Sequence, residues 1–319
     1  MRLISIFFTL LPLSVLTDLK TPIHLIWVGC DPKESWEQQW IHELFEFVPH
    51  PIVEHVDPDF TTVLPNSVLI FSVPNRPKLN RLLETYSLGS TPFALLQLSD
   101  EELLHTNLDY HDARFILRNY YSKKLARQNK KVHFIPLGYK NHFWRGFEGK
   151  IKGVNERKYN WSFAGNINRP DRLKMARYMG YIPGYFFNRG CGFNSKNALS
   201  TSSYRDLLLD TIISPCPIGN ASFDSFRVYE SLECGCIPLI QSNYASDYFK
   251  NLFGEHPLPI LQDWSEAKEK VDLLLKDKEA LEDLRQTCYR FWQDQKIGLK
   301  NKIRSLIETH FFESDGENS

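Results

Sequence analysis

The most informative part of the chain is residues 214–240, with the sequence SPCPIGNASFDSFRVYESLECGCIPLI. An apolar strand is predicted at its start, followed by a polar loop that contains Gly219. A helix over Asp224–Cys234 comes next and ends at Gly235. A second buried strand completes the stretch. A strand, a loop, a helix and another strand in this order are typical of a parallel α/β sheet.

The junction between this loop and its helix has the features of an anion site. The first N–H groups of a helix and the positive end of its dipole favour negative charge. Gly219 lets the backbone approach a ligand closely, and Ser225 and Arg227 lie where the helix begins. Glu230 follows three residues later and can accept hydrogen bonds from a ribose diol. The alternative is an ordinary helix with a surface pair of Arg227 and Glu230.

The same alternation of strands and helices extends in both directions from this stretch. Apolar runs predict further strands, and a spacing of three to four between apolar residues predicts helices. The strands are expected at 24–29, 67–73, 93–98, 115–121, 132–137, 159–164 and 211–214, and the helices at 35–47, 78–86, 171–179, 204–210 and 264–311. Residues 180–203, rich in Gly, Asn and Ser, are expected to form a loop.

This pattern predicts two α/β domains in tandem. The predicted division is a hydrophobic N-terminal segment (1–20), a first Rossmann-like domain (21–145), a second Rossmann-like domain (155–312) and a polar tail (313–319). Residues 141–158 are rich in charged residues and glycine, so we expect an exposed crossing between the domains.

The composition of the chain excludes several classes of protein. Its 38 basic and 38 acidic side chains balance, which disfavours a general nucleic-acid binder. Aromatic residues make up 13%, too many for a disordered chain. The motifs of phosphate-loop enzymes, dinucleotide dehydrogenases, zincins and α/β-hydrolases are absent. Six cysteines without a Cys-x-x-Cys pair are expected to be buried thiols, although a disulfide that involves Cys216 stays open.

The N-terminus carries a charged residue, Arg2, and then an apolar run over residues 3–16. This order matches a secretory signal or a membrane anchor, and the run is short for a bilayer span. We therefore expect a location in the secretory pathway or on its membranes, such as the Golgi. A buried N-terminal element in a cytoplasmic protein is the alternative.

Within 214–240, three groups of residues resemble the donor-binding region of exostosin-type glycosyltransferases. They are Cys216-Pro217-Ile218-Gly219, Ser225-Phe226-Arg227-Val228-Tyr229-Glu230-Ser231-Leu232 and Gly235-Cys236-Ile237-Pro238-Leu239-Ile240. Residues 163–166, together with Arg169, resemble the opening strand and loop of the same domain. Residues 117–121 and 135–139 resemble the end of the first domain in exostosin-like relatives, among which the ribitol-phosphate xylosyltransferase type is the most similar. Residues 1–90 carry no such resemblance.

The resemblance implies a GT-B architecture, in which two Rossmann-like domains face a cleft. It also implies transfer of a sugar from a nucleotide-sugar, for which we expect UDP as the nucleotide, to a glycan, a polyol phosphate or another hydroxyl acceptor. Gly165, Arg169, Gly219, Ser225, Arg227 and Glu230 are then the expected donor-binding residues. Ser231 replaces the usual alanine, and Ser222 stands where many GT-B enzymes have a further glutamate, so that sugar-contacting role is not implied here.

Two groups are needed for the chemistry. Arg227, supported by Arg169, is expected to neutralise the leaving pyrophosphate. Asp100 follows the strand at 93–98 and is the expected general base of an inverting reaction, with Glu101 beside it. A helix N-terminus with acidic first-turn residues is the alternative for Asp100. We expect no metal and no cofactor, because the only Asp-x-Asp, residues 57–59, lies among prolines.

Three other functions stay open. The first is a sugar- or nucleotide-binding protein of the GT-B type without transferase activity. The second is a phosphorylase or an epimerase on the same fold, and the third is a structural protein. The sequence does not specify the sugar, the acceptor or the stereochemistry.

Overall fold

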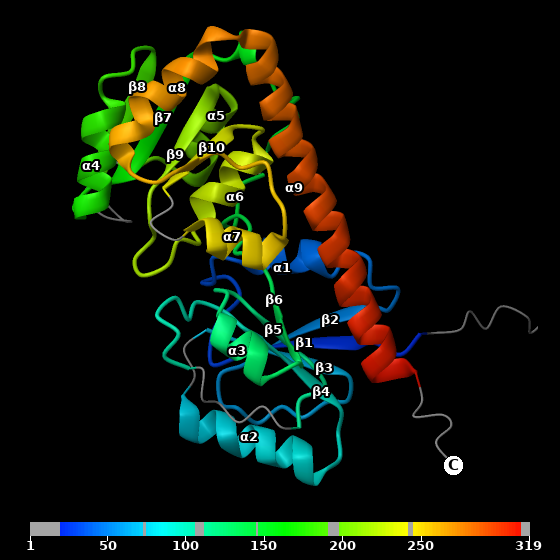
Figure 1. Cartoon of the computed structure of the whole chain (residues 1–319). Helices are drawn as coiled ribbons and strands as arrows, with labels where there is room; N and C mark the ends of the chain where they lie inside the picture. Colours follow the sequence, from blue (N-terminus) through cyan, green and yellow to red (C-terminus); the bar gives the residue numbers. More distant parts are fainter. Residues whose placement is uncertain are drawn as a thin grey trace, which may run out of the picture.

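Two parallel β-sheets, one after the other along the chain, form the framework of the molecule (Figure 1). The computed structural model describes residues 20–72, 75–105, 112–144, 146–190, 198–241 and 245–313. The first sheet has the order β2-β1-β3-β4-β5-β6, with β1 (Ile23–Val28), β2 (Ile52–Asp57), β3 (Ser67–Phe71), β4 (Phe93–Gln97), β5 (Ile116–Arg118) and β6 (Val132–Phe134). The second has the order β11-β10-β9-β7-β8, with β7 (Tyr159–Asn166), β8 (Tyr185–Gly190), β9 (Thr211–Cys216), β10 (Ile237–Gln241) and β11 (Ile260–Leu261).

Helices connect the strands and cover the sheets. They are α1 (Gln38–Leu44), α2 (Arg76–Leu88), α3 (Lys123–Gln128), α4 (Pro170–Met179), α5 (Thr201–Leu209), α6 (Phe226–Glu233), α7 (Ala245–Phe253), α8 (Ala267–Lys276) and α9 (Lys278–Ile307). Short 3₁₀ turns lie at Val154–Glu156 and Trp264–Glu266, and a π-helical turn, Glu308–Phe312, ends α9. Side chains at Asn75, Ser122, Ser200 and Asp277 cap α2, α3, α5 and α9 by accepting backbone N–H groups.

Three apolar clusters form the core. Alternate residues of β1 point to opposite faces, so that Leu25 and Trp27 join one cluster while Ile26 and Val28 join another. A third cluster fills the face of the second sheet beneath α4 and α8. The largest cluster contains Trp40 of the first domain and residues of α6 and α9, and it therefore packs the two domains against each other.

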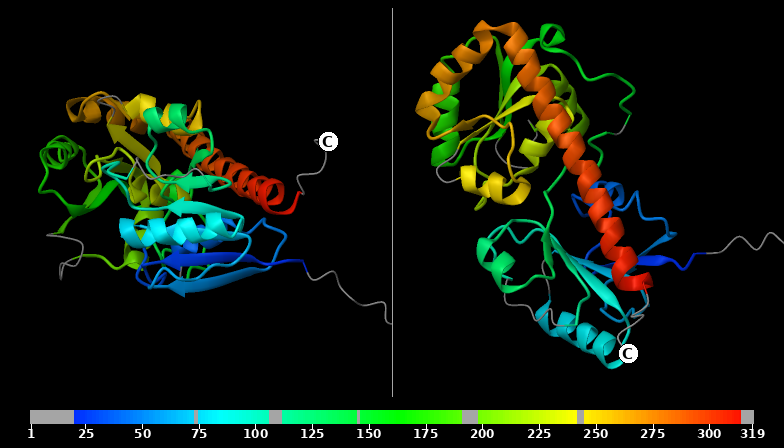
Figure 2. Two further views of the ribbon diagram at one scale, coloured as in Figure 1. Left: turned by 90° about the horizontal axis from the view of Figure 1, so that it is seen from below. Right: turned by 45° about the vertical axis from the view of Figure 1, so that its right-hand side comes forward.

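Helix α9 spans both domains (Figures 1 and 2). It packs on α6 of the second domain and on α1 of the first. The ammonium group of Lys296 lies 2.9 Å from Glu233 of α6 and 3.2 Å from Glu43 of α1. Residues 296–312, which the sequence assigned to the second domain, thus hold the first domain as well.

Most predicted strands are present, but the loop predicted at 180–203 is wrong in part. Residues Tyr185–Gly190 form β8, which pairs in parallel with β7, and the Tyr185 ring stacks on Trp161 at 4.8 Å. The aromatic run within this stretch favours a strand more than the surrounding Gly, Asn and Ser disfavour it. Strand β2, helix α3 and helix α7 were also not predicted. Residues 191–197 of the predicted loop lie outside the described residues.

The N-terminal apolar run at 3–16 lies outside the described residues. In the parts of the chain that are described, no helix combines the length and the apolar character needed to cross a bilayer. The five cysteines in these parts, Cys30, Cys216, Cys234, Cys236 and Cys288, are free thiols. Cys216 therefore belongs with the buried thiols.

Candidate functional site

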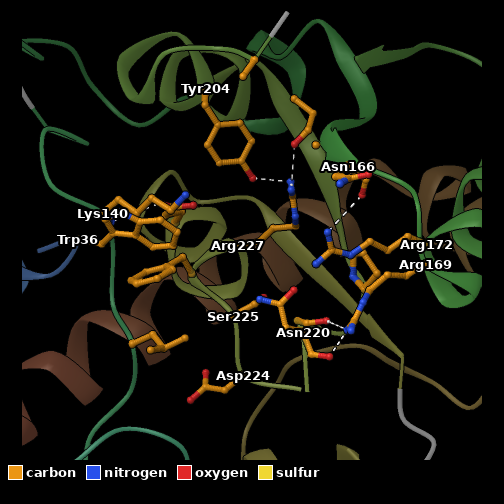
Figure 3. A pocket seen from close by; sticks show the side chains of 18 of the residues that line it. Trp36, Lys140, Asn166, Arg169, Arg172, Tyr204, Asn220, Asp224, Ser225 and Arg227 are labelled. Carbon is orange, nitrogen blue, oxygen red and sulfur yellow. Dashed lines mark hydrogen bonds between the residues drawn. The ribbon is translucent and has the colours of Figure 1, made fainter. Parts of the chain in front are cut away.

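A cavity of about 340 Å³ lies between the two domains (Figure 3). Its walls come from loops that follow the carboxyl ends of β7 and β9 in the second sheet, together with residues that follow β1 and β4 in the first. In the second sheet the chain order reverses between β7 and β9. Ligands of parallel α/β sheets bind outside the strand ends at such a reversal.

Arg227, in the first turn of α6, lies at the centre of this cavity. Its guanidinium donates one hydrogen bond to the Tyr204 hydroxyl at 2.7 Å and another to the carbonyl of Ala164 at 2.9 Å. The group stacks over the Phe163 ring at 4.4 Å. A Cβ on Gly165 would lie 2.9 Å from Nη2, so the glycine leaves the space that the guanidinium occupies.

Two further arginines, Arg169 and Arg172, come from the start of α4. Arg169 donates to the carbonyls of Gly219, at 2.8 Å, and Asn220. Arg172 donates to the carbonyl of Ile218 at 3.2 Å and to that of Asn166 at 3.2 Å. Figure 3 shows these two side chains lying beside Arg227 on one side of the cavity.

Arg169, Arg172 and Arg227, called here the arginine cluster, concentrate positive charge. Burial lowers the pKa of Arg172, and the charge of Arg227 lowers it further. Their hydrogen-bond acceptors are carbonyls and a phenol, and among the described residues no carboxylate pairs with them. Glu101 acts on Arg172, and Glu230 on Arg227, through charge and without a hydrogen bond, and three guanidinium groups bonded to neutral acceptors favour a polyanion.

Lys140 adds a fourth cation from the first domain. Its ammonium group lies 4.7 Å from the centre of the Trp36 ring and 5.8 Å from that of Phe226. Burial lowers the pKa of Lys140, while the nearby carboxylate of Glu230 opposes this shift. Figure 3 places Lys140 and Trp36 on the side away from Arg169 and Arg172, so cations approach the cavity from both domains.

Glu230 lines the cavity one turn beyond Arg227. One carboxylate oxygen accepts the backbone N–H of Lys140 at 3.3 Å, and the residue is only 3% exposed. Burial raises the pKa of Glu230, and Lys140 and Arg227 partly offset this rise. Glu230 and Arg227 have separate partners, so they do not form the surface pair that the sequence left open.

The start of α6 presents polar groups without partners. Ser225 is the N-cap residue, but its side chain makes no capping hydrogen bond. Its buried hydroxyl has no hydrogen-bond partner, and the residue lines the cavity. The first N–H groups of a helix also lack partners within the helix. A ligand with several oxygen atoms would satisfy these groups.

Asp100 and Glu101 follow β4 and point in different directions. The Asp100 carboxylate forms a buried ion pair with Arg118 and accepts the backbone N–H groups of Leu104, at 2.9 Å, and His105, at 3.0 Å. It is not among the residues that line the cavity, whereas Glu101 is. The structure therefore brings Glu101 to the other predicted site residues and leaves Asp100 as the anchor of the turn.

A second carboxylate, Asp224, closes the floor of the cavity. It accepts hydrogen bonds from the hydroxyls of Tyr229 and of Tyr248, the latter at 2.7 Å. Burial raises the pKa of Asp224 to about 6, and the two hydroxyls limit the rise. The carboxylate is buried, and its hydrogen bonds hold the side chains of Tyr229 and Tyr248 beneath the cavity.

The sequence placed Gly165, Arg169, Gly219, Ser225, Arg227 and Glu230 in one site, and all six line the cavity. Sequence reasoning missed Arg172, Lys140, Trp36 and Tyr204. Arg172 lies on the predicted helix at 171–179, three residues after Arg169. This spacing places two side chains on the same side of a helix start, so the sequence could have indicated Arg172 as a neighbour of Arg169. Outside the cavity, Asp57 of the Asp-x-Asp accepts the backbone N–H groups of Thr61 and Thr62 at 2.8 and 2.7 Å, as in an ordinary turn.

In sequence, the chain matches no known protein family, and no curated protein is similar enough to count as a relative. Solved structures do share its fold. Anabaena Alr3699/HepE, in complex with UDP and glucose, is 9% identical with a TM-score of 0.54 over 90% of this chain and 100% of that one. An α1,3-fucosyltransferase is 11% identical with a TM-score of 0.51 over 91% and 92%.

A DNA-modifying β-glucosyltransferase that uses uridine diphosphoglucose is 10% identical with a TM-score of 0.51 over 90% of this chain and 100% of that one. These similarities confirm the predicted architecture. The chain has the GT-B fold, with two parallel-sheet α/β domains, a cleft between them and a helical C-terminus.

Proposed function

We propose that this protein is a glycosyltransferase that moves a sugar from a nucleotide-sugar to a hydroxyl acceptor in the cavity between its domains. The observation that carries the proposal is the arginine cluster, whose guanidinium groups face the cavity without carboxylate partners. A nucleoside diphosphate is the polyanion that this fold accommodates in two of the similar proteins, both of which are described with uridine nucleotides.

In the proposed complex, the diphosphate lies between the arginine cluster and the start of α6. Ser225, the first N–H groups of the helix and the N–H groups of the loop before it donate to phosphate oxygens, and Gly165 and Gly219 leave room for these oxygens. Glu230 accepts the ribose hydroxyls one turn farther along. Lys140 and Arg227 flank the bond that breaks, so they stabilise the charge that develops on the leaving diphosphate.

We place the general base at Glu101 rather than at Asp100. Both oxygens of Asp100 are held by Arg118 and backbone N–H groups. Glu101 lines the cavity from the first domain, and its hydrogen bonds to described residues use only Oε1. In the reaction, the acceptor oxygen forms a bond to the anomeric carbon and gives its proton to Glu101. The bond to the diphosphate breaks, and its electron pair leaves with the phosphate. Attack from the opposite face inverts the configuration.

We further propose that transfer needs no metal, because the arginine cluster and Lys140 supply the charge that the leaving group requires. The pattern in 216–240 supports an exostosin-type origin and a UDP-sugar donor, with a glycan or a polyol phosphate as acceptor. The apolar run at 3–16 supports routing to the secretory pathway. Asn160-Trp161-Ser162 matches the Asn-x-Ser pattern of N-glycosylation. In a eukaryotic host, removal of the N-terminal residues or a glycan on Asn160 would support this location, and an uncleaved cytosolic protein would reject it.

The function is tested by a melting-temperature screen of the full chain with UDP, GDP, CMP and their sugars. A ligand at 100 times its dissociation constant stabilises a protein by about 2.7 kcal/mol, which a melting curve resolves. We expect UDP and a UDP-sugar to raise the melting temperature and EDTA to leave transfer unchanged. No response to any nucleotide would reject the proposal, and activity lost in EDTA and restored by manganese would reject its metal independence.

The competing function is nucleotide or sugar binding without transfer. It is distinguished by incubating the protein with the stabilising nucleotide-sugar and measuring release of free nucleotide with and without hydroxyl acceptors. Acceptor-dependent release supports a transferase, whereas binding without any release supports the competing function.

A further inference from the structure

Glu101 makes an unusual contact across the cleft. It follows β4 of the first domain, yet its Oε1 accepts the backbone N–H groups of Ala221, at 2.7 Å, and Ser222, at 3.1 Å, in the second domain. These residues belong to the loop between β9 and α6, which lines the cavity. One carboxylate oxygen therefore holds two successive N–H groups of the proposed donor site.

The carbonyl groups and the N–H groups of this loop have partners of opposite charge. Its carbonyls at Ile218, Gly219 and Asn220 accept hydrogen bonds from Arg169 and Arg172. Its N–H groups at Ala221 and Ser222 point the other way, toward Glu101. Successive N–H groups turned to one side form an anion-binding concavity. The anion in this concavity is the Glu101 carboxylate.

The approach of Glu101 depends on the residues around it. A Cβ on Gly219 would lie 2.7 Å from Oε1, so only glycine leaves the carboxylate its place. The backbone at Ser99 and Leu103 adopts left-handed φ angles of 60° and 55°. Asp100, between them, fixes the turn through its ion pair with Arg118. This anchored turn projects the next side chain, Glu101, across the cleft.

We propose that Glu101 is an internal stand-in for the donor diphosphate. Its negative charge lies near Arg172 and faces the same N–H groups that a phosphate would use. Two anions cannot share these groups, because like charges at contact distance repel. The arriving diphosphate displaces Glu101, and the released carboxylate is then free at the cavity wall to accept the proton of the acceptor hydroxyl. This inference rests on the proposed function.

If Glu101 competes with the diphosphate, its removal has a different effect on binding than if it only holds the domains together. Removing it should tighten the binding of the donor while turnover falls, because the competing carboxylate and the base are the same group. A residue that merely holds the domains together should instead weaken binding when it is removed. Affinity and turnover thus change in opposite directions only if Glu101 competes with the ligand.

The test uses full-length Glu101→Ala, Glu101→Gln and a matched control, Glu102→Ala, which removes the same charge from the exposed neighbour. UDP and inorganic pyrophosphate are titrated by calorimetry, and turnover is measured with the nucleotide-sugar. We expect Glu101→Ala to bind UDP about tenfold more tightly than the wild type. Glu101→Gln, which keeps an acceptor oxygen without the charge, should lie between them, and Glu102→Ala should match the wild type.

Equal or weaker UDP binding by both Glu101 variants, with the wild type still binding, would overturn the stand-in and leave the proposed function intact. Undiminished turnover in both variants would also overturn it, because the released carboxylate would then have no role as base. No UDP or pyrophosphate binding by any of the four proteins would reject the proposed function and the stand-in together.

Discussion

The guanidinium group of Arg227 has a fixed orientation in the cavity. It is held between the rings of Phe163 and Tyr204 and bonded to a phenol and a carbonyl, so its orientation is set before any ligand arrives. A guanidinium fixed in this way loses little conformational entropy when it binds phosphate. In the proposed reaction, its charge is thus already in place when negative charge develops on the leaving diphosphate.

Arg227→Ala should lower turnover more than donor affinity, because the contact strengthens as the diphosphate leaves. Loss of one such stabilising group lowers turnover on the order of 100-fold. Arg227→Lys keeps the charge without the planar fork and should lie between the two. Turnover and the Michaelis constant for the donor, measured for each variant, check this. Near-wild-type turnover of Arg227→Ala would remove it from the reaction.

Asp224 gives the stability of the protein a pH dependence. Burial raises the pKa of Asp224 in the folded protein to about 6, above its value in the unfolded chain. Between these two pKa values the folded state binds more protons than the unfolded state, so stability rises as the pH falls. A difference of about two units corresponds to about 3 kcal/mol.

The side chain of Asp224→Asn does not titrate. We therefore expect the unfolding free energy of the wild type, relative to that of Asp224→Asn, to increase as the pH falls from 7 toward 4. Denaturant melts of both proteins at several pH values measure this gain. A difference that is flat with pH, or that changes in the opposite direction, would contradict the raised pKa.

The site residues divide into those that the sequence could predict and those that it could not. Gly219, Ser225, Arg227 and Glu230 lie within 12 consecutive residues of a loop and a helix, and local geometry alone brings them together. Lys140, Trp36 and Glu101 reach the cavity from the other domain, so their place depends on how the domains pack. Asp100 and Glu101 illustrate the limit, because the identity of the residue that faces the cleft depends on a turn anchored by distant Arg118.

At the level of elements, α6 has two functional faces. One face presents Arg227 and Glu230 to the cavity, and an adjacent face, at the end of the helix, carries Glu233, which pairs with Lys296 of α9. Glu233 accepts the indole N–H of Trp292 at 2.8 Å and pairs with Lys296, which also pairs with Glu43 of α1. The helix that carries the proposed donor site is thus fixed to both domains through α9.

Lys296→Ala should destabilise the protein strongly, because it removes the cation that pairs with the buried carboxylate of Glu233, whereas Glu43 keeps Lys300 at 3.2 Å. Removing one partner of a buried ion pair costs about 3–5 kcal/mol. The matched control is Arg290→Ala, which removes an exposed cation from the same helix and should have little effect. Denaturant melts compare the two variants, and equal stability in both would contradict the role of Lys296.

The elements themselves were largely predictable. Strands buried on both faces, such as β1, β3 and β4, are near-continuous apolar runs, and the parallel order follows from the helices between them. Strand β2 was missed because it lies at an edge and is mostly exposed, so it lacks an apolar run. The position of α9 across both domains could not be predicted. Its apolar periodicity indicates that one face is buried, but not which elements cover that face.

At the level of the whole molecule, the two domains meet in a continuous apolar core, and the cavity lies beside it. The stacked rings of Trp40 and Trp292, 5.7 Å apart, join the first domain to α9. The domains therefore have a defined relative orientation around the site. Because this core fixes the two domains relative to each other, Lys140 of the first domain and the arginine cluster of the second can contact the same ligand.

Helix α4 offers a direct test of whether the arginine cluster binds the diphosphate of a nucleotide, as we propose. Arg172 faces the cavity, whereas Arg177 lies exposed on the same helix, five residues away. UDP is titrated by calorimetry into the wild type, Arg172→Ala and Arg177→Ala, with melting temperatures recorded to confirm folding.

Loss of a charged hydrogen bond, worth about 1.5–3 kcal/mol, should weaken UDP binding about 10- to 150-fold in Arg172→Ala. Arg177→Ala should bind UDP like the wild type. No UDP binding by the wild type at millimolar concentration, or the same loss of affinity in both variants, would contradict the claim.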